Sequence, residues 1–115
     1  MGFTLWGNDE ACQILDSGYN QRQTFDKNHE IFTGVLHIYE GETIARPKCD
    51  ILPKGVKTIA RSSSDKPCIM CYDDLRNGRI VVDTGFTKLY EECYRKTAGT
   101  SRYFVNALCW LGKTY

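Results

Sequence analysis

Apolar positions along the chain form short runs separated by turn residues between residues 56 and 84. Runs at Val56–Ser62, Pro67–Tyr72 and Arg79–Thr84 have the length of strands and are too short for helices. The Asn77-Gly78 pair before the third run is a strong hairpin signal. We therefore predict an antiparallel meander of three strands. The continuous run Ile80-Val81-Val82 predicts that the third strand is buried on both faces.

The C-terminal segment Thr97–Leu111 has the period of an amphipathic helix. Thr97 or Thr100 can cap its first turn, and Gly112 lies just past its end. Residues at i, i+3, i+4 and i+7 predict the buried face of this helix, which consists of Phe104, Ala107, Leu108 and Leu111.

The N-terminal half carries weaker patterns. Phe3–Trp6 predicts a short strand, ended by a turn or helix cap at Gly7-Asn8-Asp9. Glu10–Ser17 predicts a short helix, and the polar stretch Asn20–Glu30 predicts a loop. Ile31–Tyr39 fits either one helical face or a compact turn. Together with the C-terminal elements, these segments predict an α/β fold with a mixed sheet.

Length and charge restrict the class of protein. The 115 residues (13.2 kDa) have room for one domain, residues 1–115. With 15 Lys+Arg against 14 Asp+Glu, the net charge of +1 argues against a nucleic-acid partner. The chain shows neither a secretory signal nor an apolar run that could cross a membrane. We expect a cytoplasmic protein without a membrane partner.

Six cysteines could form three disulfides, but without an export signal we expect reduced thiols. The Cys68-Ile-Met-Cys71 spacing can hold zinc or carry out thiol redox chemistry. A structural zinc site needs two further ligands, and the segment has the pattern of a strand instead of a helix start. We therefore expect buried thiols, no metal and no cofactor. The six residues are Cys12, Cys49, Cys68, Cys71, Cys93 and Cys109.

Several segments resemble one known family. Gly78–Tyr90 and Ala98–Leu111 are similar to the C-terminal part of class I glutamine-amidotransferase-like domains, in particular trehalose-utilisation-type and uncharacterised members. Gly2–Asn8 is similar to the strand that leads to the nucleophile elbow of that family, and Ile31–Ile44 to a stretch in mid-domain. The resemblance implies a flavodoxin-like mixed sheet whose opening strands would precede residue 1. The chain would then be the later part of a larger domain, with a protein partner or a second copy covering an exposed sheet edge.

The resemblance also implies a module without catalysis. The elbow would fall at Gly7-Asn8-Asp9, where there is no cysteine, and Cys12 lies several residues further on. The family's histidine position would fall beside Phe86. Because nucleophile and base act as a unit, the loss of both leaves little of the mechanism. The alternative is a small thiol-dependent hydrolase that uses Cys12 with His29 or His37.

A retained binding site is expected where the third predicted strand ends, because open α/β sheets bind ligands at such ends. The resemblance places the Gly7-Asn8-Asp9 segment across the cleft from it. A tight turn that requires Gly85 is the structural alternative. We expect a partner or small ligand to bind where these segments converge, at Gly7, Asn8, Asp9, Asp83, Thr84, Gly85 and Phe86.

Overall fold

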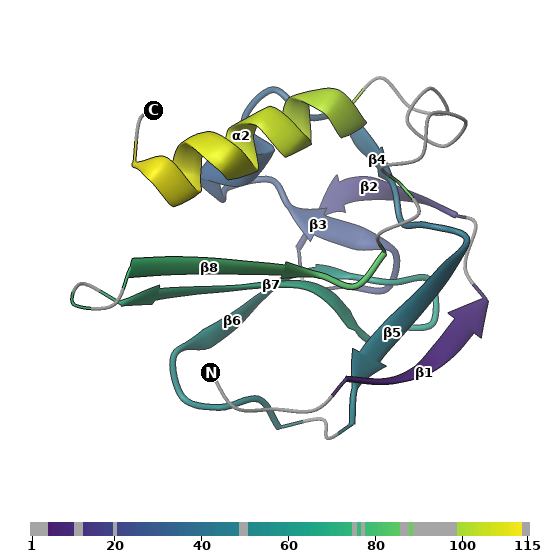
Figure 1. The fold of residues 1–115 in the computed structure, drawn as a ribbon. Coiled ribbons are helices and arrows are strands. Elements are labelled where there is room, and N and C mark those ends of the chain that lie inside the picture. Colours follow the sequence, from purple (N-terminus) through teal and green to yellow (C-terminus); the bar gives the residue numbers. More distant parts are fainter. Residues whose placement is uncertain are drawn as a thin grey trace.

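The computed structural model describes residues 5–10, 13–19, 21–48, 51–74, 76, 78–85, 88 and 99–113. Strands dominate the chain up to residue 83, and one long helix follows near the C-terminus (Figure 1). The elements are β1 (Leu5–Glu10), β2 (Ile14–Gly18), β3 (Thr24–Asp26), the 3₁₀ helix η1 (Glu30–Phe32), β4 (His37–Tyr39), β5 (Thr43–Pro47), β6 (Val56–Arg61), β7 (Pro67–Asp74), β8 (Gly78–Asp83) and α2 (Thr100–Gly112).

Six of these strands form a mixed, curled sheet in the order β4-β2-β3-β6-β7-β8, and β1 pairs with β5 in a separate two-stranded sheet. Within the six-stranded sheet, β2 and β3 are parallel, and the other pairs are antiparallel. The predicted α/β class with a mixed sheet and a terminal helix is therefore confirmed. The flavodoxin-like arrangement stays a prediction.

The predicted meander is confirmed as β6, β7 and β8, which pair in chain order. Gly78 pairs with Asp74 at the hairpin and has a φ of +93°, a conformation that favours glycine. The predicted burial of the third strand is wrong. β8 lies at the end of the sheet, so Ile80 is 40% exposed, and Val81 and Val82 are only half-buried.

The helix predicted over Glu10–Ser17 is wrong, because residues 14–18 form β2. Leu15 is buried opposite Ile38 of β4, while Ile14 beside it is exposed. Two neighbouring apolar residues fit the period of a helix as well as that of a strand. Pairing with β3 and β4 stabilises the strand. The loop predicted at Asn20–Glu30 is also partly wrong, since it contains β3.

The segment Ile31–Tyr39 is a compact turn followed by a strand, which was one of the two predicted alternatives. η1 buries Ile31 and Phe32, and β4 follows at residue 37. The side-chain amide of Asn106 on α2 donates to the backbone oxygens of Ile31 (3.0 Å) and Thr33 (2.8 Å). These bonds fix the turn of η1 beneath the helix.

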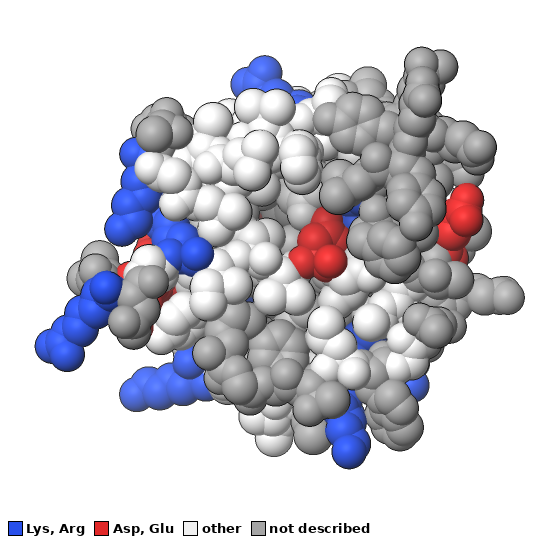
Figure 2. All heavy atoms as spheres, viewed as in Figure 1, with Lys and Arg blue, Asp and Glu red and all other residues white. Residues whose placement is uncertain are grey.

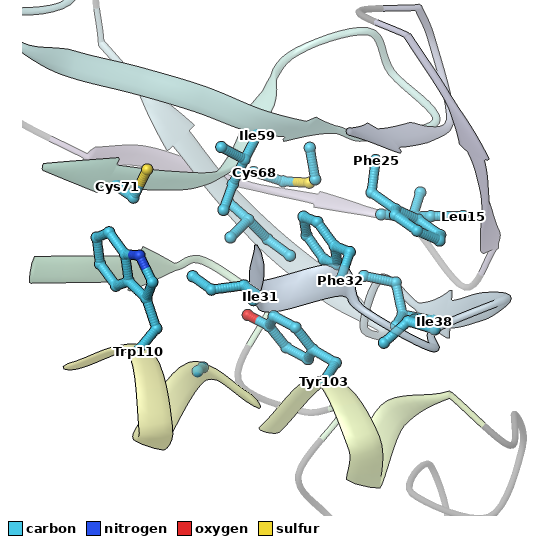
Figure 3. Close-up of a cluster of buried hydrophobic side chains, with 14 of the residues drawn as sticks. Leu15, Phe25, Ile31, Phe32, Ile38, Ile59, Cys68, Cys71, Tyr103 and Trp110 are labelled. Carbon is cyan, nitrogen blue, oxygen red and sulfur yellow. The ribbon is translucent and has the colours of Figure 1, made fainter. Parts of the chain in front are cut away.

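An aromatic column connects the sheet, η1 and α2 in the core (Figure 3). The rings of Phe25 and Phe32 are 4.7 Å apart, and Phe32 stacks on Tyr103 at 5.5 Å. In Figure 3, Tyr103 and Trp110 both point from α2 into the buried cluster. These two large side chains attach the helix to one face of the sheet.

The buried face of α2 differs from the predicted face. It consists of Thr100, Tyr103, Ala107 and Trp110, so Ala107 alone was correctly predicted. The predicted caps are also wrong for the described residues: Thr100 is the first helical residue, and Lys113 ends the helix with a φ of +56°. Thr97 lies outside the described residues. As a result, Phe104, Leu108 and Leu111 project to the outside of α2, where they are 37%, 54% and 38% exposed.

A buried carboxylate joins three segments on the β4 side of the sheet. Glu40 is 1% exposed, and its Oε2 accepts from the backbone N–H of Gln13 at 2.9 Å. Its Oε1 accepts from the N–H of Ser63 at 3.0 Å and from the Ser63 hydroxyl at 3.1 Å. Multiple donors compensate a carboxylate for its lost water, so Glu40 fixes the start of β2 and the β6–β7 turn to the end of β4.

Candidate functional site

A groove of about 190 Å³ lies between the outer side of α2 and the C-terminal half of β8. Apolar side chains form most of its wall, and the exposed outer residues of the helix form one rim. Figure 2 shows mostly uncharged atoms over the middle of α2 and β8, with acidic atoms beside them. The groove is lined by Val81, Asp83, Gly85, Lys88, Tyr103, Phe104, Ala107, Leu108 and Leu111.

A buried polar cluster lies at the end of this groove, where β8 ends. Oδ1 of Asp83 accepts from Lys88 Nζ at 2.5 Å and from the backbone N–H of Gly85 at 2.9 Å. The Tyr103 hydroxyl donates to Oδ2 at 2.5 Å. Burial, together with the charge of Asp83, raises the pKa of Tyr103 well above its ordinary value, so its hydroxyl remains a donor. The cluster contains one cation and one anion and has no net charge.

The backbone of β8 offers hydrogen-bonding groups beside the groove. The N–H of Thr84 donates to Cys68 O at 2.9 Å, which shows that this pair is hydrogen-bonded. Hydrogen-bonded and non-bonded pairs alternate in antiparallel strands. The N–H and C=O of Arg79, Val81 and Asp83 therefore point away from β7. In the part of the chain that the structure describes, β8 is the last strand of the sheet on this side.

Of the predicted site residues, Asp83 and Gly85 line the groove and Thr84 does not. Thr84 is buried, and its hydroxyl donates to Cys68 O at 3.1 Å. Gly85 passes so close to β4 that a Cβ atom would lie 1.8 Å from the backbone oxygen of Glu40. The structural alternative, a turn that requires glycine, therefore has direct support at Gly85.

The turn predicted at Gly7-Asn8-Asp9 is wrong. These residues lie inside β1, where a bulge between Trp6 and Asp9 shifts the register against β5. Gly7 has a φ of +81°. A bulge, rather than a strand-to-helix elbow, therefore accounts for the glycine.

The segment Gly7-Asn8-Asp9 and the end of β8 were predicted to converge. Among the described residues, only an indirect link through β5 connects them. Asp9 pairs with Ile44, and the N–H of the next residue, Ala45, donates to Thr84 O at 3.5 Å. Phe86 lies outside the described residues. Convergence at one site therefore stays a prediction.

His29 and Cys71 form a pair that the sequence patterns do not indicate. Cys71 Sγ lies 3.6 Å from His29 Nε2, and the backbone N–H of Ile31 donates to His29 Nδ1 at 3.2 Å. Because Nδ1 accepts, the neutral imidazole carries its proton on Nε2, facing the sulfur. To act as a base for the Cys71 thiol, His29 would need a free lone pair on Nε2. Burial lowers the pKa of His29 and raises that of Cys71 to about 11, so both groups are neutral.

The other candidate residues that the structure describes do not line the groove. Cys12 is outside the described residues, and His37 forms an exposed pair with Asp16 at 2.9 Å. Cys68, Cys71 and Cys109 are free thiols, and the first two are buried as expected. Burial raises the pKa of Cys68 far above its ordinary value. Among the described residues, no group of three or more His, Cys, Asp or Glu side chains is arranged to hold a metal ion, and no helix is long and apolar enough to span a membrane.

Sequence reasoning missed Lys88, Tyr103 and the outer side of α2. Lys88 and Tyr103 follow Asp83 by five and by twenty residues, and no local motif connects them. The width of the apolar stripe along Thr97–Leu111 could have indicated that the outer side of α2 is also apolar. Both Tyr103 and Trp110 add to the four predicted apolar positions, and six such residues exceed what one core-facing stripe requires.

Comparison with known proteins gives no relative: no protein-family model, curated protein or solved structure matches the chain. The likeness to amidotransferase-like domains therefore remains an expectation from short motifs.

Proposed function

We propose that the chain is a non-catalytic binding module that holds an extended segment of a protein partner along β8. The segment would add a strand to the sheet and place alternate side chains in the groove under α2. One observation carries the proposal: the outward backbone of Val81 and Asp83 lies beside the exposed apolar side chains of Phe104 and Leu108. Strand addition requires both features, because backbone bonds supply affinity and side-chain pockets supply specificity.

The polar cluster supports this assignment. Lys88 is 1% exposed and, among the described residues, gives its one hydrogen bond to Asp83. The Asp83 side chain, which is 20% exposed, is the part of the cluster that a ligand at the end of the groove could contact. The cluster has no net charge, which favours a neutral polar group such as a peptide carbonyl over a free anion.

The absence of a nucleophile at the expected elbow supports a non-catalytic role. The resemblance to amidotransferase-like domains requires a cysteine at residues 7–9, which hold Gly, Asn and Asp. A flavodoxin-like parent domain and a cytoplasmic location belong to the same proposal. The thiol hydrolase alternative depends on Cys12, and the neutral His29–Cys71 pair gives it no support.

Selection from a random peptide library tests the proposal. We expect the immobilised chain to enrich peptides with apolar residues at alternate positions. Val81→Pro removes an outward N–H and leaves the bonds to β7 intact, so it is expected to weaken these peptides about tenfold or more. The measurement is the Kd of synthetic peptides by fluorescence anisotropy, after circular dichroism has shown that the variant is folded.

Ile51→Glu serves as the matched control. Ile51 is 87% exposed and lies outside the groove, so its substitution is expected to leave the Kd unchanged. Equal binding to wild type and Val81→Pro, or no enrichment at all, would contradict strand addition. Enrichment limited to small apolar molecules in a parallel screen would assign the groove to a small ligand.

A further inference from the structure

We propose that the segment that occupies this site is β8 of a second copy of the chain. Two copies would join their sheets edge to edge in a two-fold symmetric dimer. This inference rests on the proposed function, because it names the occupant of the same strand edge and groove.

The two edges of the six-stranded sheet are protected to different degrees. β4 at one end is three residues long, and a very short edge strand offers little for another chain to pair with. β8 at the other end is six residues long, and its centre is Ile80-Val81-Val82. Lysine and proline commonly block exposed edges, and β8 has neither. Its two charged residues, Arg79 and Asp83, are bonded to Trp110 and Tyr103 of α2, and among the described residues no further strand covers this edge. This edge has the properties of a pairing surface.

β8 is complementary to itself in one antiparallel register. The outward residues are Arg79, Val81 and Asp83, and only a pairing centred on Val81 uses all three on both strands. In this register Arg79 lies opposite Asp83 of the second copy, and Ile80 lies opposite Val82. β-branched pairs directly across a ladder favour pairing, whereas the charged groups of Arg79 and Asp83 are already bonded within their own chain. The side chains of Arg79 and Asp83 share the α2 face, since they contact Trp110 and Tyr103 respectively.

The same symmetry would cover the outer side of α2. The two-fold axis of a pair of antiparallel strands runs perpendicular to the joined sheet, so both copies of α2 lie on one face of it. Phe104, Leu108 and Leu111 line the groove together with Val81 and Asp83 of β8, and in the dimer they would face their counterparts across the axis. The net charge of +1 per chain leaves little long-range repulsion between two copies.

Sedimentation equilibrium of the full chain over a wide concentration range tests the inference. We expect a monomer–dimer equilibrium in the wild type. Val81→Pro removes a central backbone donor, and Leu108→Glu places charge on the outer side of α2. Each is expected to weaken association about tenfold or more. Ile51→Glu changes an apolar residue that is 87% exposed and lies outside the groove, and it is expected to dimerise like the wild type.

Cysteine cross-linking tests the register. Ile80 and Val82 would form non-hydrogen-bonded pairs across the axis, with Cα atoms about 4.5 Å apart, which is within disulfide reach. Mild oxidation of a mixture of Ile80→Cys and Val82→Cys chains is therefore expected to give disulfide-linked dimers. Each variant alone, and the wild type with its native thiols, is expected to give far fewer.

The outcomes separate this inference from the proposed function. A wild-type chain that stays monomeric at every concentration would overturn the second-copy assignment, as would a dimer that survives both Val81→Pro and Leu108→Glu. In either case, library peptides that bind the wild type and not Val81→Pro would leave strand addition standing. If Val81→Pro does not fold, sedimentation of Leu108→Glu and the cysteine cross-links test whether a second copy occupies the β8 edge.

Discussion

At the scale of single residues, two buried threonines differ in what their hydroxyl groups contact. The hydroxyl of Thr84 donates to Cys68 O, whereas that of Thr100 has no hydrogen-bond partner among the residues that the structure describes. An unsatisfied buried hydroxyl costs about 1–3 kcal/mol. We therefore expect Thr100→Val to raise the free energy of unfolding by about 1 kcal/mol, measured by urea denaturation.

Thr84→Val is the matched comparison for Thr100→Val. It removes a satisfied hydroxyl and leaves a buried carbonyl without its donor, so we expect a loss of about 1 kcal/mol. Equal losses in the two variants would show that the Thr100 hydroxyl has a partner in solution.

Gly85 has no room for a side chain. A Cβ atom would lie 1.8 Å from Glu40 O, which is backbone and cannot move aside easily. We expect Gly85→Ala to lower the free energy of unfolding by about 3 kcal/mol. At Gly78 no described residue beyond its chain neighbours lies within 4 Å of such a Cβ, so Gly78→Ala is expected to cost only the strain of its positive φ, about 1 kcal/mol. Denaturation of both variants checks the difference, and equal losses would contradict the contact at Gly85.

His29 should make stability depend on pH. Burial lowers its pKa below the ordinary 6.5, although the nearby Glu30 acts in the opposite direction. Below pH 6.5 the unfolded chain therefore binds more protons than the folded chain, and stability falls as the pH drops toward the lowered folded pKa. We expect the free energy of unfolding to fall between pH 7 and about pH 5. His29→Gln should flatten part of this slope, and an unchanged slope would contradict the assignment.

At the scale of elements, the apolar stripe of α2 is wide enough to cover both the side that packs on the sheet and part of the outer side. Trp110 is buried over the sheet, while the next residue, Leu111, is 38% exposed. We expect Trp110→Ala to cost about 3 kcal/mol and Leu111→Ala about 1 kcal/mol or less. Thermal and urea unfolding at low protein concentration measure the difference. The face predicted from periodicity would give the reverse order.

The elements that the sequence predicts well are those with local signals. The β7–β8 hairpin follows from a turn that requires a positive φ at Gly78, and α2 follows from a sustained helical period. β2 and β3 could not be predicted in this way, because their apolar content is small. Leu15 and Phe25 are buried only through pairing with strands distant in sequence.

The candidate site shows the same limit. The sequence predicts a ligand site at the end of the third strand, and two residues of that prediction, Asp83 and Gly85, line the groove. Ligand binding there stays a prediction. Lys88 and Tyr103 could not be assigned to it, because the helix brings Tyr103 back over β8 only in the folded chain. The exposure of Ile80 depends on the position of β8 in the sheet order, which its own run of residues does not encode.

At the scale of the whole molecule, pairing through β8 would link stability to concentration. A ligand or partner that binds only the folded state raises its apparent stability by mass action. We expect the Tm of the wild type to rise with protein concentration and that of Val81→Pro to stay constant. Differential scanning fluorimetry over a dilution series measures this. A rising Tm in both proteins would place the association on another surface.

The Glu40 carboxylate has a consequence for how the molecule fluctuates. The amides of Gln13 and Ser63 are far apart in sequence, and each donates to one oxygen of the same buried group. Neither amide can reach solvent without disturbing the carboxylate that holds the other. Their hydrogen-exchange rates should therefore change together under any substitution at residue 40, as two reporters of a single opening event.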